Sequence, residues 1–180
     1  MRYEMTTSTT PSLTVKTITL TINGQSVTVP KGTTVLQAAL GVGIHIPTFC
    51  WHPKLKSVGA CRICYVEIEK MPKLQVSCSV VATEGMVVRT NSDQVKQGRK
   101  AVLEFLLANH PLDCPVCDQA GECGLQDYSV EHGLDTTHMV DRRRTFPGYE
   151  RRMIGPHVVQ NQNRCIHCTR CIRFTTEISE

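Results

Sequence analysis

The sequence predicts an α+β fold in which a small sheet domain comes first and a helical, loop-rich region follows it. Three observations predict this arrangement. Apolar residues alternate with threonine across residues 17–29, as in a strand, whereas residues 93–109 carry apolar residues at helical spacing. All ten cysteines fall into three groups, and aromatic residues make up only 5% of the chain. We therefore expect small modules organised partly around metal rather than one large apolar core.

A β-hairpin is predicted over residues 17–29, because Asn23-Gly24 stands between two alternating runs and supplies a tight turn. A short helix is expected from Val35 to Leu40. Thr33 or Thr34 caps its start, and a glycine follows its last residue. Three further strands are expected, at residues 65–69, 74–77 and 86–89.

From residue 92 the pattern becomes helical. Residues 93–109 are predicted to form a helix that Pro111 stops. Five apolar side chains of this helix are available for burial: Val95, Val102, Leu103, Phe105 and Leu106. A second helix is expected over residues 119–130, an extended Arg-rich connector over residues 133–160, and a last helix over residues 169–179.

The first cysteine group supplies four thiolates, from Cys50, Cys61, Cys64 and Cys78. Four thiolates are what a [2Fe–2S] cluster needs, and the ten-residue gap lets one loop wrap over it. Gly59-Ala60 leave room for backbone N–H groups to reach the cluster sulfides. A structural zinc site is the alternative, but such sites usually pair two Cys-x2-Cys knuckles and only one is present here.

The second group places one histidine and three cysteines close together: His110, Cys114, Cys117 and Cys123. Taken alone, this set also suits zinc held by three cysteines and a histidine. Beside two other cluster-like groups it favours a His-ligated [4Fe–4S] cluster, in which the neutral imidazole makes the cluster less anionic. The remaining histidines are expected to be ordinary surface or packing residues: His45, His52, His132, His138, His157 and His167.

The third group, Cys165, Cys168 and Cys171, supplies three corners of a [4Fe–4S] cluster. In the common compact run a fourth cysteine follows four residues later, and here that position is Thr175. We expect the fourth ligand to lie beyond residue 180, in a chain that is cut short. A ligand from a partner, a three-iron cluster or an empty site are the alternatives.

Charge and motifs narrow the function class. The net charge is +4, and residues 141–173 contain eight arginines but only two acidic residues. This basic stretch suits a solvated loop or nucleic acid, but it also offsets the negative charge of cysteine-ligated clusters. Residues 1–14 are expected to be a disordered tail, and no apolar run is long enough to span a bilayer. We find no nucleophile–base pair, dinucleotide fingerprint or P-loop, so an electron carrier without a substrate active site is expected.

The order of hairpin, helix, metal loop and further strands is that of a β-grasp ferredoxin. The full expectation is a β-grasp [2Fe–2S] ferredoxin-like domain (15–91) followed by a small helical, loop-rich [4Fe–4S]-binding domain (92–132). Residues 133–180 would be the Arg-rich connector and the start of a further [4Fe–4S] domain.

The three cysteine groups, together with Asn109 to Cys123 and Arg164 to Phe174, resemble the N-terminal part of the large iron–sulfur subunit of respiratory complex I, the NADH:quinone oxidoreductase. The resemblance implies the same three ligand sets, with a fourth cysteine for the third set some tens of residues later. It also implies a flavin- and NADH-binding partner subunit, other peripheral-arm partners and a place on the cytoplasmic side of a bacterial inner membrane.

Two alternatives remain open. Electron-input modules of NAD-linked hydrogenases and formate dehydrogenases share this layout, and their cofactors would be the same. A zinc-stabilised binding module, for example one for nucleic acid, would use the arginines of residues 142–152. It would be colourless, and its binding would weaken steeply with salt.

Overall fold

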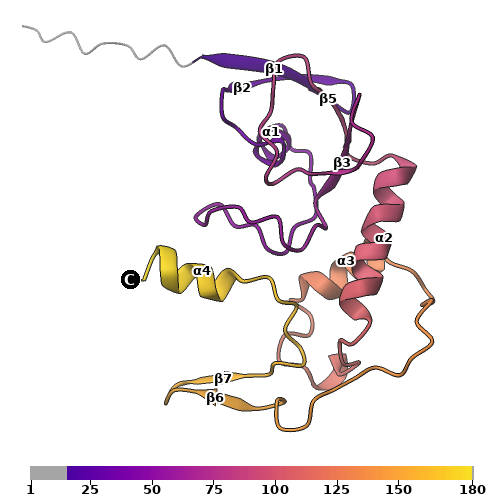
Figure 1. Ribbon diagram of the computed structural model, residues 1–180, viewed down its shortest axis with the longest axis vertical. Helices are drawn as coiled ribbons and strands as arrows, with labels where there is room; N and C mark the ends of the chain where they lie inside the picture. Colours follow the sequence, from indigo (N-terminus) through magenta and orange to yellow (C-terminus); the bar gives the residue numbers. More distant parts are fainter. Residues whose placement is uncertain (1–15, 180) are drawn as a thin grey trace, which may run out of the picture.

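The structure is a computed structural model that describes residues 16–179, so the tail expected over residues 1–14 lies outside the described residues. A sheet with one helix forms one end of the molecule, and the long helix α2 leads from it to the helical region (Figure 1). The strands are β1 (Thr17–Ile22), β2 (Gln25–Pro30), β3 (Tyr65–Ile68), β4 (Gln75–Val76), β5 (Val87–Arg89), β6 (Arg152–Ile154) and β7 (Val158–Gln160). The helices are α1 (Val35–Gly41), α2 (Asp93–Leu107), the 3-10 turn η1 (Cys114–Val116), α3 (Gly124–His132) and α4 (Arg170–Glu177).

The predicted hairpin is confirmed as β1 and β2, which pair antiparallel from Thr17 with Pro30 to Ile22 with Gln25. Both turn residues have positive φ, 50° at Asn23 and 85° at Gly24. This is the turn whose twist matches that of the two strands, and asparagine and glycine adopt it at low cost.

A five-stranded sheet with the order β2-β1-β5-β3-β4 forms the first domain, and β1 and β5 pair parallel. Helix α1 packs on this sheet, and Thr34 caps it by a capping box with Gln37. The helix runs through Gly41, one residue further than expected, and the strands after it are shorter than expected. The ferredoxin-like core lies between sheet and helix and includes Leu20, Ile22, Leu36, Val66 and Val88.

Helix α2 begins after Ser92, whose hydroxyl accepts the N–H of Val95 at 3.4 Å. Val95 and Leu103 are buried as expected, but Phe105 is 82% exposed, so the expectation of its burial is wrong. Phe105 lies two residues after Leu103, which places it about 200° further round the helix, away from the core.

Arg99 occupies a buried position of α2 that the apolar pattern did not indicate. It is 4% exposed, and its Nη2 donates to the carbonyl oxygens of Thr90 at 2.9 Å and Tyr65 at 3.2 Å. The guanidinium thereby joins α2 to strand β3 and to the segment that follows β5.

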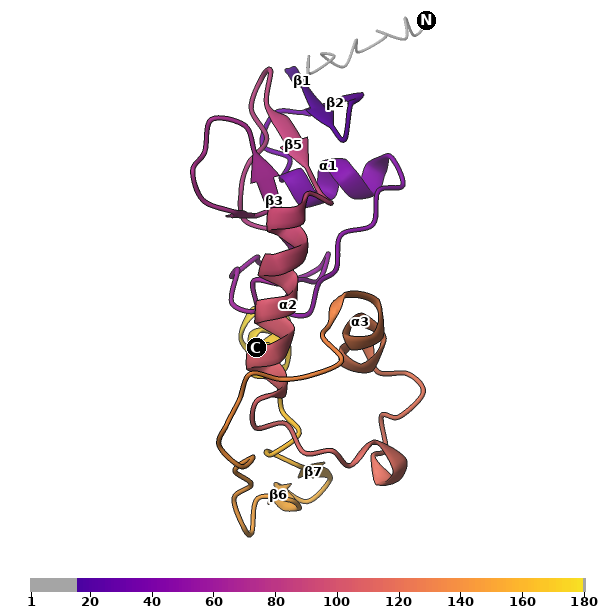
Figure 2. The same cartoon turned by 90° about the vertical axis from the view of Figure 1, so that its right-hand side faces the viewer.

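Two expectations for the second half were wrong. The helix expected from residue 119 begins at Gly124, because residues 117–123 make tight turns, with φ of 85° at Gly121. The connector expected to be extended contains the hairpin of β6 and β7, which turns at Gly155, where φ is 72°. In the views of Figures 1 and 2 this hairpin lies at the end of the molecule opposite the sheet.

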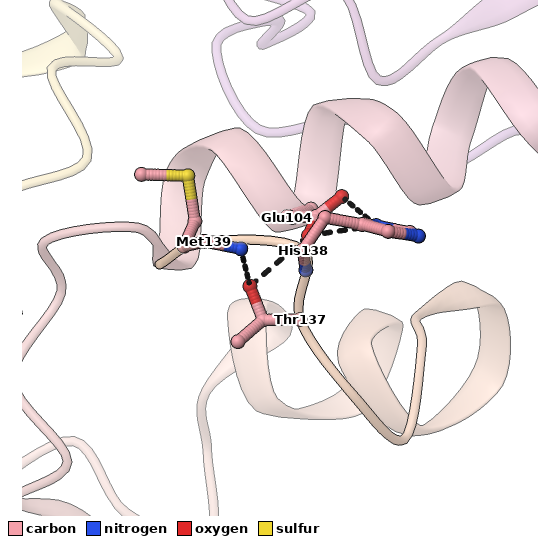
Figure 3. A network of polar contacts seen from close by, with 4 residues as sticks. All are labelled: Glu104, Thr137, His138 and Met139. Carbon is pink, nitrogen blue, oxygen red and sulfur yellow. Dashed lines mark hydrogen bonds and ion pairs between the residues drawn. The ribbon is translucent and has the colours of Figure 1, made fainter. Parts of the chain in front are cut away.

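The start of the connector is attached to α2 through Glu104. Figure 3 shows its carboxylate accepting bonds from the Thr137 hydroxyl at 3.0 Å and from the backbone N–H of His138 at 2.5 Å. The His138 ring Nδ1 lies 3.1 Å from the same carboxylate, and Met139 N–H donates to the Thr137 hydroxyl. The chain after α3 is therefore held against α2 by side-chain contacts.

Candidate metal centres

The first cysteine group lies together between the α1–β3 loop and the segment after β4. Cys50, Cys64 and Cys78 are at most 1% exposed, and the N–H of Cys50 donates to Cys61 Sγ at 3.4 Å. The Cys78 thiol lies within hydrogen-bonding reach of those of Cys50 and Cys64. The structure thus brings together all four predicted thiols of this group.

Hydrogen bonds between the thiols shift their pKa values. A hydrogen bond with Cys50, together with burial, raises the pKa of the Cys61 thiol. A hydrogen bond with Cys78 lowers the pKa of Cys64. Crowded, mutually bonded thiols fit a site that binds metal as thiolates and releases their protons when it does so. Soft thiolate donors of this kind select iron–sulfur clusters or zinc.

The backbone of the first loop adopts left-handed conformations beside its ligands. Gly59 has φ of 61°, and a Cβ there would lie 3.0 Å from Ser79 Oγ, so a small residue is needed for conformation and space alike. Arg62, between Cys61 and Cys64, has φ of 60°. Non-glycine residues rarely adopt this conformation, and such residues are concentrated at functional sites. The sequence carried no signal for Arg62.

The second group lines one small cavity. His110 follows the end of α2, Cys114 begins η1, Cys117 follows it, and Cys123 caps the start of α3. Asp113, Gln126 and Arg164 are the other polar residues of its lining. Burial lowers the pKa of His110, which favours the neutral imidazole that ligates metals. A cavity lined by three thiols and one imidazole fits the proposed donor set.

The thiols of the third group are less buried than those of the first group and make fewer contacts with one another. Cys165 and Cys168 are partly buried, Cys171 is exposed, and none of the described contacts joins the three thiols. The loop is nevertheless tightly wound: His167 and Thr169 have φ of 53° and 61°, and the N–H of His167 donates to Cys165 Sγ at 3.4 Å. Neither left-handed residue could be read from the sequence, because neither is glycine.

An apolar cluster lies where the three ligand-bearing segments meet. Its buried members are Phe49, Ile63, Leu103 and Leu125. Cys61 of the first group, Cys123 of the second and Ile166, next to Cys165 of the third, all pack against it. The three candidate centres therefore share one apolar wall, a proximity that sequence spacing could not indicate.

Within the described part of the chain, no three His, Cys, Asp or Glu side chains are grouped as they would be around a single metal ion. Cluster ligands surround several iron and sulfide atoms rather than one ion. Residues 16–179 contain no helix with the length and apolar character that crossing a membrane requires. Of the other histidines, His45 and His132 each lie with their ring centroid 6.1 Å from that of Tyr128.

Three family models match successive parts of the chain. Residues 15–93 match a 2Fe-2S iron-sulfur cluster binding domain, and residues 99–138 match the NADH-ubiquinone oxidoreductase-G iron-sulfur binding region. Residues 155–180 match the ferredoxin-like domain of NADH-quinone oxidoreductase subunit 3. The predicted cofactor types, [2Fe–2S] and [4Fe–4S], are thereby confirmed, and these matches favour clusters over a zinc-held module.

Curated relatives agree with these models. The NADH-ubiquinone oxidoreductase 75 kDa subunit of Reclinomonas americana is 51% identical over 158 residues, and the corresponding NADH-quinone oxidoreductase subunit of Rickettsia bellii is 48% identical over 162 residues. These alignments cover 88% and 90% of this chain but only 22% and 23% of the relatives. The chain thus spans less than a quarter of the length of the relatives that it matches.

Among solved structures, an NAD+-reducing [NiFe]-hydrogenase in its H2-reduced state has a similar fold. The TM-score is 0.73 with 33% sequence identity, and the match covers 88% of this chain and 66% of that chain. The predicted α+β, ferredoxin-like fold is confirmed by these comparisons together.

Proposed function

Because this chain belongs to the family of the large iron–sulfur subunit of NADH-quinone oxidoreductase, we propose that it is an electron-transfer segment of such an enzyme. Bound clusters would supply one-electron chemistry. The residues of the chain hold the clusters, exclude water from them and set their charge environment. We place no substrate-converting site within these residues.

We assign three ligand sets to this function. The [2Fe–2S] ligands are Cys50, Cys61, Cys64 and Cys78. The ligands of a His-ligated [4Fe–4S] cluster are His110, Cys114, Cys117 and Cys123. Cys165, Cys168 and Cys171 would be three ligands of a further [4Fe–4S] cluster. The domains are correspondingly 15–91, 92–132 and 133–180.

The observation that carries this proposal is the apolar cluster at which the three ligand-bearing segments meet. Cys61, Cys123 and Ile166 pack on the same buried side chains. Electron tunnelling falls steeply with distance, so a chain that carries electrons between clusters must hold them close with little water between them. This packing supports a function in which the chain transfers electrons from one cluster to the next, and does not merely bind the clusters.

We further propose the direction and setting of the relay. Electrons would enter from a flavin-containing subunit that oxidises NADH and leave towards quinone. The names of those relatives include NADH and quinone. The partners would be the neighbouring subunits of a peripheral arm. The location would be the cytoplasmic side of a bacterial inner membrane.

A second candidate is supported by the similarity to the NAD+-reducing [NiFe]-hydrogenase at 33% identity. In that case the same clusters would exchange electrons with a hydrogenase or formate dehydrogenase. Reduction of the clusters in the isolated complex distinguishes the two: reduction by NADH and reoxidation by a quinone support the first candidate. Reduction by H2 or formate supports the second.

The primary test is the iron, acid-labile sulfide and zinc content of anaerobically purified protein, with EPR of its reduced state. About six irons per chain would show the first two clusters, and about ten would show that the third finds its missing ligand. Stoichiometric zinc without labile sulfide would refute the electron-carrier function and leave a zinc-held binding module.

A further inference from the structure

Arg173, on helix α4, is buried between the first and third candidate centres. It is 6% exposed, and its guanidinium donates to the carbonyl oxygens of Cys50 and Cys168, the second at 3.4 Å. The same side chain donates to the carbonyl of Lys56 at 2.7 Å and to the hydroxyl of Thr169 at 3.2 Å. One side chain thus binds the backbone of a ligand residue from each of two centres.

The rest of α4 holds the same loop. Arg170 donates to the carbonyl of Phe49, and the Glu177 carboxylate accepts the N–H of Lys56 at 2.9 Å. In Figure 1 helix α4 lies beside the loop between α1 and β3. Arg173 is the member of this set that is buried and also reaches a residue of the third group.

The partners of Arg173 are all neutral. Within residues 16–179 no Asp or Glu forms an ion pair with it. A buried cation is costly unless a negative charge offsets it. Cysteine-ligated clusters are the negative groups that the ligand sets on either side would hold.

We propose that Arg173 is a shared counter-charge for the first and third centres, positioning both ligand loops and raising the reduction potential of the [2Fe–2S] cluster. The inference rests on the cluster occupancy of the proposed function. Reduction adds an electron to a cluster, so a buried positive charge favours the reduced form. The effect is large because the site is shielded from solvent.

The test is a redox titration monitored by EPR. The measured quantity is the reduction potential of the [2Fe–2S] cluster, because all four of its proposed ligands lie in this chain. Arg173→Gln is expected to lower the equilibrium constant for reduction about tenfold, which is about 59 mV for a one-electron couple. Arg173→Lys keeps the charge and is expected to retain most of the wild-type potential. The signal of the His110 centre is expected to stay unmoved.

Arg151→Gln is the matched control, because it removes one positive charge from an exposed position just before β6. An unmoved potential in Arg173→Gln, or an equal shift in Arg151→Gln, would overturn the inference. If Arg173→Gln fails to assemble its cluster, the test rests on Arg173→Lys: a potential close to that of wild type supports the counter-charge, and a lost signal or a potential lowered by about 59 mV overturns it. Wild-type protein without labile sulfide would instead refute the proposed function and this inference together.

Discussion

Arg164 and Asp113, 51 positions apart in the chain, form an ion pair between two ligand-bearing loops. Nη2 and Nε of Arg164 lie 3.1 Å and 3.3 Å from Asp113 Oδ2. Arg164 directly precedes Cys165, and Asp113 directly precedes Cys114. The pair therefore ties the third cysteine group to the second one at the level of the backbone that carries the ligands.

Breaking this pair is expected to destabilise the junction modestly. The two side chains are 22% and 44% exposed, so solvent screens the pair, and we expect a coupling of about 0.5 kcal/mol. Asp113→Asn and Arg164→Gln should each lower the Tm by about 2 °C. The double variant should lose less than the sum of the single losses. Additive losses in a thermal double-mutant cycle would show that the two residues act independently.

Replacing His110 by cysteine is expected to leave the second cluster assembled but to lower its reduction potential. An anionic thiolate replaces a neutral imidazole, and the extra negative charge disfavours reduction. Potentiometric EPR measures the shift, and His157→Cys, which adds a cysteine away from the site, is the control. A signal that does not move in His110→Cys would show that His110 is not a ligand.

The apolar cluster shared by the three ligand-bearing segments predicts a strong contrast between two neighbouring residues of α2. Leu103→Ala is expected to cost about 2–5 kcal/mol, because it leaves a cavity at a side chain that is 1% exposed. Phe105→Ala, at an 82% exposed position, should cost less than about 0.5 kcal/mol. Thermal unfolding compares them, and similar losses in both variants would contradict the packing described here.

The attachment of the connector to α2 is expected to depend on pH. The N–H and ring of His138, with the Thr137 hydroxyl, lower the pKa of Glu104 from its ordinary value of 4.5. A carboxyl with a depressed folded-state pKa stabilises the fold above its unfolded pKa, and this stabilisation is lost as pH falls through the folded value. Glu104→Gln should therefore weaken the connector near pH 7 and differ little from wild type in acid.

Amide hydrogen exchange over residues 137–145 measures this attachment, with Glu104→Gln compared to wild type at each pH so that intrinsic exchange rates cancel. Lys100→Gln, one helical turn earlier on α2, is the control for a change on the helix that leaves the contact intact. If the difference in exchange rate between Glu104→Gln and wild type stayed constant from pH 7 to acid, the ionised Glu104 carboxylate would not be what holds the connector.

Several elements were predictable because their signals are local. The β1–β2 turn needs two residues that tolerate positive φ, and Asn23-Gly24 supply them. Helix α1 needs a cap, which Thr34 supplies together with Gln37. The cluster types follow from the number and chemistry of the ligands, which the sequence displays directly. Which residues ligate remains a prediction of the sequence that the structure accommodates.

Other features depend on contacts between distant segments. Apolar spacing marks α2 as amphipathic, but its partners decide that Leu103 is buried and Phe105 is exposed. The β6–β7 hairpin was missed because its strands are only three residues each and the chain around them is rich in arginine and interrupted by glycine and proline, as in a connector.

The sequence by itself determined the order of modules, the hairpin, the cap of helix α1 and the set of donors available to iron, because each depends on residues that are close together in the chain. Only the tertiary structure decided how the three centres meet. The apolar wall that they share and the position of Arg173 between Cys50 and Cys168 join segments up to 123 residues apart. The physical reason is that composition and spacing specify which apolar, charged and metal-binding side chains a segment carries. Tertiary packing decides which residues from distant segments those side chains contact.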